Sequence, residues 1–322
     1  MSRAATAAGP APDGALGRVL AWLSDRPRLS ALAGAACIAF SGILFRTSGS
    51  SPSTATFFRC LYGLPLLVAL GWYEHRRFGP PAASTVRFAV LAGVFFAGDL
   101  LFWSHAIEAV GAGLATVLGN LQVVVVGIAA WLLFGERPTR LIGIALAIVL
   151  VGVVLISGVV GGGAYGADPP LGIVFGLVTA VCYGAYLLTM RHGGRDLRRS
   201  AGPVAISTAT TALVALVAGA IVGDLDLVPS WPSVGWLVLY GVTSQSLGYV
   251  LISISLPRLP AVLTSIILLS QPIATVLLGI VLLGEAPSPL QLAGVGLVMA
   301  GVAVASGIID RWRSPAEAHA AA

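Results

Sequence analysis

Three ionisable residues stand close together in a stretch that is otherwise apolar. The segment GVFFAGDLLFWSHAIEAVGAG, residues 93–113, contains Asp99, His105 and Glu108 within ten positions. A carboxyl group that exchanges a proton in such surroundings could act as a proton carrier. A histidine and a glutamate three residues apart lie on one helix face and could bind a metal ion. No second pair of ligands accompanies His105 and Glu108, so we expect no metal site.

The composition around these residues is typical of a membrane protein. Of the 322 residues, 57% are hydrophobic and 10% are charged, whereas soluble domains carry about 25% charged residues. All 18 basic residues are arginines, and they lie between apolar runs. This placement favours charges that set membrane topology over charges that bind nucleic acid. We therefore expect an all-α integral membrane protein in a lipid bilayer, without a nucleic-acid partner.

Ten apolar segments approach the length of about 20 residues that a helix needs to cross a bilayer. They lie near residues 29–46, 54–72, 88–108, 111–134, 140–160, 171–190, 202–222, 233–256, 260–283 and 288–309. The connections between them are short and rich in Gly, Pro and Ser. We expect a cytoplasmic N-terminal segment, two five-helix units and a cytoplasmic tail, with boundaries at 1–28, 29–160, 171–309 and 310–322.

The arginines also predict the orientation of the chain in the membrane. If the N-terminus is cytoplasmic, 16 of the 18 arginines fall in segments on the cytoplasmic side, and the five outer loops contain none. Basic residues are concentrated in the cytoplasmic segments of membrane proteins. The expected location is thus the cell membrane (the inner or plasma membrane), crossed several times, with both termini in the cytoplasm.

The second half of the chain repeats the first at one constant offset. The matching residues are Gln122 and Gln271, Gly135-Glu136 and Gly284-Glu285, Pro138 and Pro287, and Ser157-Gly158 and Ser306-Gly307. Because each unit contains five spans, an odd number, the second unit enters the membrane upside down. Inverted repeats of this kind are typical of secondary transporters.

Short motifs make the chain similar to a known family. The Phe58-Arg59 pair, LLFGERP at 132–138 and LLGEAPS at 282–288 resemble the EamA family of the drug/metabolite transporter superfamily. The resemblance covers roughly residues 30–309. It implies ten transmembrane helices in two inverted five-helix EamA repeats, with secondary transport of small solutes and often export. The family often has a proline in the fourth helix, where this chain has Val123, although the repeat partner Pro272 is present.

Depth in the membrane separates the three ionisable residues of the first motif. With about 1.5 Å of rise per residue, Asp99 lies about 18 Å from the inner end of its helix, close to the middle of a core about 30 Å thick. Placing an acidic side chain at that depth costs about 2.5–3.5 kcal/mol of membrane-insertion free energy. We therefore expect Asp99 to bind substrate or a coupling proton, or else to make a structural hydrogen bond between helices. His105 and Glu108 lie near the outer interface and are secondary candidates.

Arg59 lies near the outer end of the second span. Three roles are open for it: pairing with Glu108, binding an anionic group of a substrate, or snorkelling to the outer headgroups.

Several polar and aromatic residues near mid-depth complete the candidate substrate site. Asn120 and Gln271 line a cavity, unless they only pack between helices. Gln122 lies about 160° from Asn120 on a helical wheel, so these two side chains are not expected to face the same cavity. The other candidates are Gln245 and Tyr249, which share one helix face. Trp103, a secondary candidate, could form an apolar wall together with Tyr183 and Tyr186.

The glutamates of the two G-E-x-P motifs are expected to be structural. Glu136 and Glu285 lie at helix ends on opposite sides of the membrane, each shortly before a proline and the next span. A carboxylate in that place stabilises a helix N-terminus.

These features favour a secondary active transporter, an exporter of a small metabolite, amino-acid-like or drug-like solute that works by alternating access. Asp99 would carry a coupling proton, and substrate and proton could compete for it. The alternatives are a non-transporting scaffold or sensor and an intramembrane enzyme. Neither H-E-x-x-H nor G-x-S-x-G occurs, so we expect no catalytic residue and no cofactor. Small-residue helix faces are compatible with a homodimer and equally with internal packing.

Overall fold

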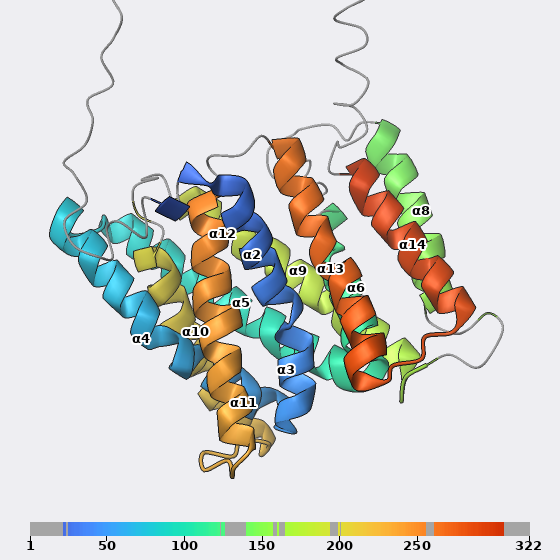
Figure 1. The fold of residues 1–322 in the computed structure, drawn as a ribbon, viewed down its shortest axis with the longest axis horizontal. Coiled ribbons are helices and arrows are strands. Elements are labelled where there is room, and N and C mark those ends of the chain that lie inside the picture. The colour runs from blue at the N-terminus through green and yellow to red at the C-terminus, as the bar shows by residue number, and fades with distance from the viewer. Residues whose placement is uncertain are drawn as a thin grey trace, which may run out of the picture.

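The computed structural model describes residues 22–23, 25–122, 124–125, 140–156, 160, 165–193, 199, 201–255 and 261–305. Over these ranges every regular element is a helix, which confirms the all-α prediction (Figure 1). The helices are α2 (Pro27–Ala39), α3 (Ser41–Ser48), α4 (Pro52–Phe78), α5 (Ala83–Val110), α6 (Ala112–Gly119), α8 (Arg140–Ile156), α9 (Pro169–Gly193), α10 (Ala201–Val222), α11 (Ser233–Tyr240), the π-helix η1 (Gly241–Gly248), α12 (Tyr249–Ser255), α13 (Ala261–Leu283) and α14 (Pro289–Ala305).

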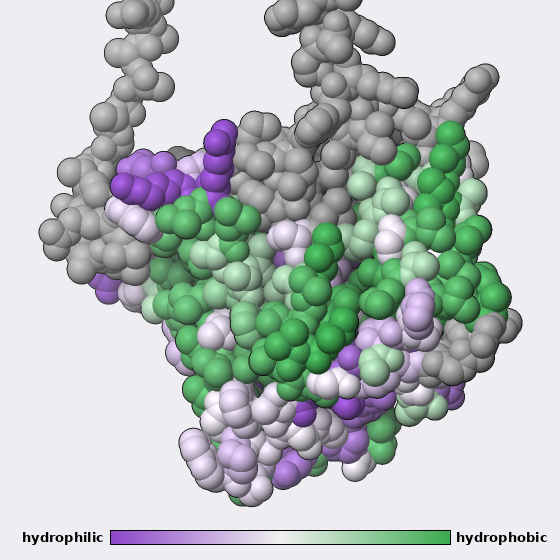
Figure 2. Space-filling model, turned by 45° about the vertical axis from the view of Figure 1, so that its right-hand side comes forward, coloured by the Kyte–Doolittle hydropathy of each residue, from purple (hydrophilic) through white to green (hydrophobic). Residues whose placement is uncertain are grey.

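Six helical spans among the described residues are long and apolar enough to cross a membrane. They are Pro27–Ser48, Pro52–Phe78, Ala83–Val110, Pro169–Met190, Ala201–Val222 and Ser233–Ile252. Three shorter apolar helices accompany them, within α8, α13 and α14. Apolar residues cover the middle of the face in Figure 2, and hydrophilic residues gather near its upper left and lower edges. The chain is therefore a multi-pass membrane protein, while the count of ten spans stays a prediction.

Three pairs of equivalent helices pack against each other between the two halves of the chain. Helix α4 packs against α10, α6 against α13, and α8 against α14; α8 and α14 lie side by side at the right of Figure 1. The repeat seen in the sequence relates the two members of each pair. Helices α8 and α14 both have 17 residues. The repeat thus places these equivalent helices next to one another.

Carboxylates tie the α4–α10 pair together at both ends. Glu74, near the end of α4, accepts hydrogen bonds from the backbone N–H groups of Ala201 and Gly202 at the start of α10, at 2.9 and 2.8 Å. Asp224, just after α10, accepts from the N–H of Ser53 at the start of α4, at 3.3 Å. Backbone N–H groups in the first turn of a helix lack partners within the helix, so each carboxylate satisfies them and favours the helix dipole.

The fourth span is interrupted, which corrects the expectation of one continuous segment over 111–134. Helix α6 ends at Gly119, and the next two residues form a turn. The N–H of Leu121 bonds to the carbonyl of Leu118, three residues back. Val123 stands where the EamA family often has a proline, so a proline does not cause this interruption. Gly119 and Asn120, at the end of α6, are weak helix formers. Asn120 also donates its side-chain amide to the carbonyl of Thr116, in competition with the backbone.

The corresponding span of the second repeat is continuous. Helix α13 passes through Pro272 without ending. The half that carries the proline therefore keeps its helix, and the half that lacks it is interrupted.

The eighth span, predicted over 233–256, contains the π-helix η1 between α11 and α12. Its hydrogen bonds join residues five apart in sequence rather than four. The side chains after Gly241 therefore point in other directions than they would on an α-helix. Ser246 donates its hydroxyl to the carbonyls of Gly63 on α4 and Gly241 in η1, at 2.6 and 3.3 Å. The π-helix is thus fixed against α4, the helix that carries Arg59.

Candidate functional site

A cavity of about 310 Å³ lies between helices of both repeats. Its volume is at the small end of the range for ligand pockets. Its polar lining residues are Ser41, Arg59, Asp99, Thr116, Asn120, Gln122, Thr179, Gln271 and Thr275, and its aromatic ones are Trp103, Tyr183, Tyr186 and Tyr249. Five of the six predicted substrate residues, all except Gln245, therefore lie on one cavity.

Arg59 supplies a positive charge to this cavity. Its side chain is on α4 and only 2% exposed. Nε donates to Oε1 of Gln245 and Nη1 donates to the hydroxyl of Tyr240, both at 2.8 Å. The guanidinium carbon lies 4.7 Å from the ring centroid of Tyr240, in a cation–π contact. These contacts hold the side chain inside the protein, so the snorkelling alternative is wrong.

Gln245 lies beside the cavity rather than on its surface. Its side chain is completely buried. Oε1 accepts from Arg59, and Nε2 donates to the hydroxyl of Thr208 on α10 at 3.0 Å. A Cβ atom on Gly63 would lie 2.8 Å from Cγ of Gln245, so only glycine at this place on α4 lets the amide come so close. Gln245 thus connects α4, η1 and α10 and holds the guanidinium of Arg59.

Asp99 is the carboxylate of the cavity. It is 7% exposed and lies on α5 beside Leu100 and Trp103. Thr179 of α9 donates its hydroxyl to the backbone carbonyl of Asp99 at 3.5 Å, the limit of a hydrogen bond. Arg59 acts on the carboxylate electrostatically. In the part of the chain that the structure describes, neither a hydrogen bond nor an ion pair occupies the carboxylate, which leaves its oxygens available to a ligand or a proton.

Three amide side chains line the cavity, and two of them lie where the sequence did not predict them together. Asn120 and Gln122 both reach it, although an ideal helical wheel separates them. In the turn after Gly119, the N–H of Leu121 bonds three residues back rather than four, so the angle of about 100° per residue does not apply there. Oε1 of Gln122 is buried and accepts no hydrogen bond from the described residues. Gln271 lies on the cavity from the other repeat, as expected.

Aromatic side chains form the apolar part of the wall. The rings of Tyr183 and Tyr186 stack with their centroids 5.7 Å apart, and Tyr186 stacks on Phe96 at 4.6 Å. The ring of Tyr249 meets Phe96 edge-on at 5.5 Å. Trp103 lies on the same cavity, so all three predicted wall residues line it. Stacked rings keep their positions, so this wall offers a fixed flat surface to a ligand.

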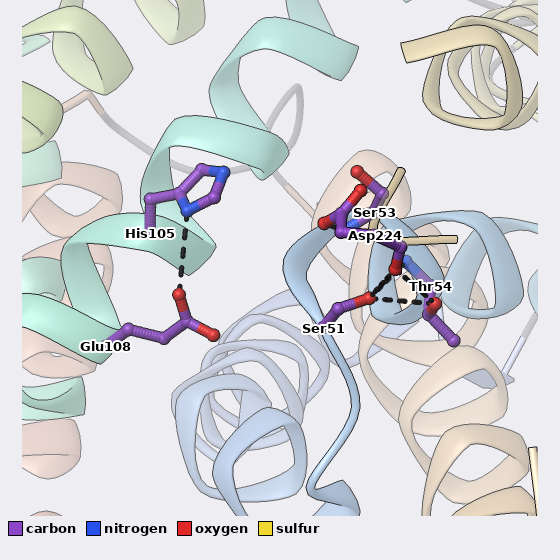
Figure 3. A network of polar contacts seen from close by, with 6 residues as sticks. All are labelled: Ser51, Ser53, Thr54, His105, Glu108 and Asp224. Carbon is purple, nitrogen blue, oxygen red and sulfur yellow. Dashed lines mark hydrogen bonds and ion pairs between the residues drawn. The ribbon is translucent and has the colours of Figure 1, made fainter. Parts of the chain in front are cut away.

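His105 and Glu108 lie apart from the cavity. His105 Nδ1 lies 3.5 Å from a carboxylate oxygen of Glu108, and their side chains are 35% and 47% exposed. Figure 3 shows the two pointing toward each other from α5. Glu108 is thus partnered by His105 and not by Arg59, whose guanidinium is buried against Tyr240 and Gln245. The predicted Arg59–Glu108 pair is wrong, because Arg59 is buried inside the protein and Glu108 lies on an exposed surface.

Glu285 caps a helix, as the sequence predicted. Its carboxylate oxygens accept from the backbone N–H groups of Ala112 and Gly113 at the start of α6, at 2.5 and 3.1 Å. Gly111 precedes them with φ of +87°, and a Cβ atom there would lie 2.7 Å from the carboxylate. Glycine at this position allows both the turn and the close approach. Glu136, the repeat partner of Glu285, lies outside the described residues.

Sequence reasoning missed two residues that complete the site. Tyr240 contacts the guanidinium of Arg59 with both its ring and its hydroxyl, and Thr208 binds the far end of Gln245. Both lie about 150 or more positions from Arg59 along the chain, and no local pattern marks them. Thr208 occupies the repeat position equivalent to Arg59, which is the one signal that could have identified it.

The family of the chain follows from a match over most of its length. The EamA-like transporter family matches residues 27–158 and again 170–307. The chain belongs to the EamA-like transporter family. Members of this family are membrane transporters of the drug/metabolite type rather than enzymes. The two matches are the two repeats that the Gln, G-E-x-P and S-G residues indicated, so this EamA protein is built from two EamA units.

Two known proteins are similar to this EamA protein. The uncharacterized protein PA1977 of Pseudomonas aeruginosa is 30% identical over 247 residues, which make up 76% of this chain and 80% of the relative. A protein of known crystal structure shares 20% identity, with a TM-score of 0.60 over 87% of this chain and 98% of the other. This second likeness supports the fold.

Proposed function

We propose that this EamA protein is a secondary active transporter that carries a small solute through the cavity between its two repeats. The observation that carries the proposal is that residues of both repeats line one cavity. The first repeat contributes a buried Arg59 and a buried Asp99 to it. Ionisable residues inside a membrane are costly and by default mark a transport pathway. Rocking of two inverted repeats around a site shared by both is the basis of alternating access.

The full proposal includes ten membrane spans in the cell membrane, with both termini in the cytoplasm. Its units are the terminal segments 1–28 and 310–322 and the two repeats 29–160 and 171–309. In this orientation α9 ends and α10 begins at the cytoplasmic side. Met190 and Val204 lie on the cavity within one turn of those ends. A cavity that extends toward the cytoplasm fits the loading step of an exporter.

Asp99 is proposed to carry the coupling proton. Its carboxylate lies in the cavity, so it meets the solute and, through the same opening, water. Asp99→Asn keeps the size of the side chain but cannot exchange a proton. We expect this variant to lose solute uptake driven by a pH gradient in proteoliposomes. Asp226→Asn, a matched change in an exposed outer loop, serves as the control and should transport as the wild type does. Unchanged pH-driven transport by Asp99→Asn would refute the proton role.

Solute counterflow distinguishes transport from the other functions. Proteoliposomes loaded with unlabelled solute should accumulate the labelled solute without chemical change. Absence of counterflow across a library of metabolites would favour a scaffold or sensor, and chemical conversion of the label would favour an enzyme.

A further inference from the structure

We infer that Arg59 is an anion-binding site and that the solute is therefore an organic anion with an apolar, ring-sized body. Gln245 is the residue that positions the guanidinium for this task. The inference rests on the proposed transport function, because it names the substrate class of the same cavity.

Arg59 carries a buried positive charge. The side chain is 2% exposed and lies within a membrane-spanning helix. Among the described residues, no carboxylate lies within 4 Å of the guanidinium, and its hydrogen-bond partners, Gln245 and Tyr240, are neutral groups. A buried charge without a counter-ion is costly. An anionic ligand in the cavity would supply a counter-ion in direct contact with the guanidinium.

The guanidinium of Arg59 keeps hydrogen-bond donors available to a ligand. Arg59 has five N–H donors. The Nε–H is used by Gln245 and one Nη1–H by Tyr240. Both hydrogens of Nη2 and the second of Nη1 remain without an acceptor among the described residues. These three donors form the end of the fork that binds a carboxylate with two parallel hydrogen bonds, and Arg59 lines the cavity.

Gln245 holds this end of the fork in place. The amide is completely buried and is itself anchored to Thr208 on α10, in the same repeat. Its position depends on the π-helix η1, which turns the side chain toward α4. π-helical turns are rare and frequently lie at functional sites. Because Gln245 does not reach the cavity, it acts on a ligand only through Arg59.

The remainder of the cavity indicates the body of the anion. Trp103, Tyr183, Tyr186 and Leu100 provide flat and aliphatic surfaces, which bind rings and short apolar chains. The volume of about 310 Å³ limits this body to a small molecule. The anion thus has a polar end at Arg59 and an apolar end among the aromatic residues.

Asp99 shares this cavity and would repel an anion when it is ionised. Anion and proton would therefore bind together, in contrast to the competition expected for a cationic solute. Arg59 on α4 acts electrostatically on the carboxylate of Asp99. Asp99 in turn acts on the titratable groups Cys182, Tyr183 and Tyr186 on α9 and Tyr249 on α12. Arg59 is the cation among them, so an anion on Arg59 removes the positive charge that favours ionised Asp99.

The test is equilibrium binding of three probes to the purified full-length protein in nanodiscs. Benzoate, benzamide and benzylamine have the same ring and differ in charge. We expect benzoate to raise Tm and to bind with uptake of a proton, measured by titration calorimetry in two buffers of different ionisation enthalpy. Benzamide and benzylamine should leave Tm unchanged. Asp99→Asn should bind benzoate at least as tightly as the wild type does, without proton uptake.

Variants of Arg59 and Gln245 test the site itself. Arg59→Gln should lower benzoate affinity about 10- to 100-fold, because it removes a charge-assisted hydrogen bond. Gln245→Glu places a carboxylate against Arg59 at nearly unchanged size, so it should abolish the benzoate shift while the protein stays folded. Gln245→Met, the control at the same position, removes one neutral hydrogen bond and should lower affinity only about 2- to 10-fold.

Three results would overturn the inference. They are a Tm shift with benzylamine but not with benzoate, no shift with benzoate at millimolar concentration, and benzoate binding that Gln245→Glu leaves intact. None of these three results contradicts the transport function, which solute counterflow tests separately. Loss of counterflow together with intact benzoate binding would instead contradict the transport function and leave the anion site standing.

Discussion

Arg59 and Glu108 show how the surroundings of a residue decide its role. Both are charged and both belong to spans of the first repeat. Arg59 is buried against Tyr240 and Gln245 and lines the cavity, whereas Glu108 is half exposed and pairs with His105. A buried charge is costly unless something binds it, and an exposed pair costs little. The burial of Arg59 therefore points to function, and the exposure of Glu108 does not.

This difference predicts a mild effect for the exposed pair. Glu108→Gln should change the free energy of unfolding by less than about 1 kcal/mol, because exposed ion pairs contribute little. Transport should remain within about twofold of the wild type, since the side chain is outside the cavity. Tm of the purified protein and initial uptake rates measure the two quantities. A loss of transport with unchanged Tm would show that the pair lies on the solute pathway after all.

At the scale of elements, carboxylates join helix ends across the two repeats. Glu285 caps α6, Glu74 caps α10 and Asp224 reaches the start of α4. Figure 3 shows Asp224 beside Ser51 and Thr54 at that start. Each contact connects segments more than 120 residues apart in sequence. The pairs of equivalent helices are thus held by their ends as well as by packing.

The Glu285 contact predicts a measurable loss of stability. Glu285→Gln leaves one oxygen to accept from Ala112 or Gly113, and it turns an NH₂ group toward the other N–H. Because Glu285 is only 3% exposed, water cannot replace the lost acceptor. We expect the free energy of unfolding to fall by about 1–3 kcal/mol, measured by thermal or denaturant unfolding in detergent.

The exposed Glu108→Gln variant is the matched control, since it makes the same chemical change. Equal Tm values for Glu285→Gln and Glu108→Gln would contradict the capping role.

At the scale of the whole molecule, the inverted arrangement makes a prediction about sidedness. Val228 in the loop after α10 is 86% exposed and is expected outside, whereas Ala82 in the loop before α5 is exposed and is expected inside. Single cysteines at these two positions, in a variant with Cys37, Cys60 and Cys182 changed to alanine, report the orientation. A membrane-impermeant maleimide added to intact cells should label Val228→Cys alone, and lysis should expose Ala82→Cys.

The reverse labelling pattern would show that the arginines predict the wrong orientation. Labelling of both sites in intact cells would contradict their placement on opposite sides of the membrane.

The sequence by itself determined the class of the protein, its two repeats and its main candidate residues. These are local or additive properties: apolar length, the side on which arginines lie, and matching residues at a constant offset. An ionisable residue such as Asp99 in an apolar span can also be recognised without a structure, because its cost depends mainly on depth. The EamA family and the helical fold followed from the same signals.

Only the tertiary structure decided which side chains face the cavity and which groups hold them. The helical wheel assumes a constant turn of about 100° per residue. That assumption fails after Gly119, where α6 ends, and in η1, where Gln245 lies. These departures bring Gln122 into the cavity and turn Gln245 toward Arg59. The partners Tyr240 and Thr208 come from distant segments that meet only when the repeats pack, so no local pattern could specify them.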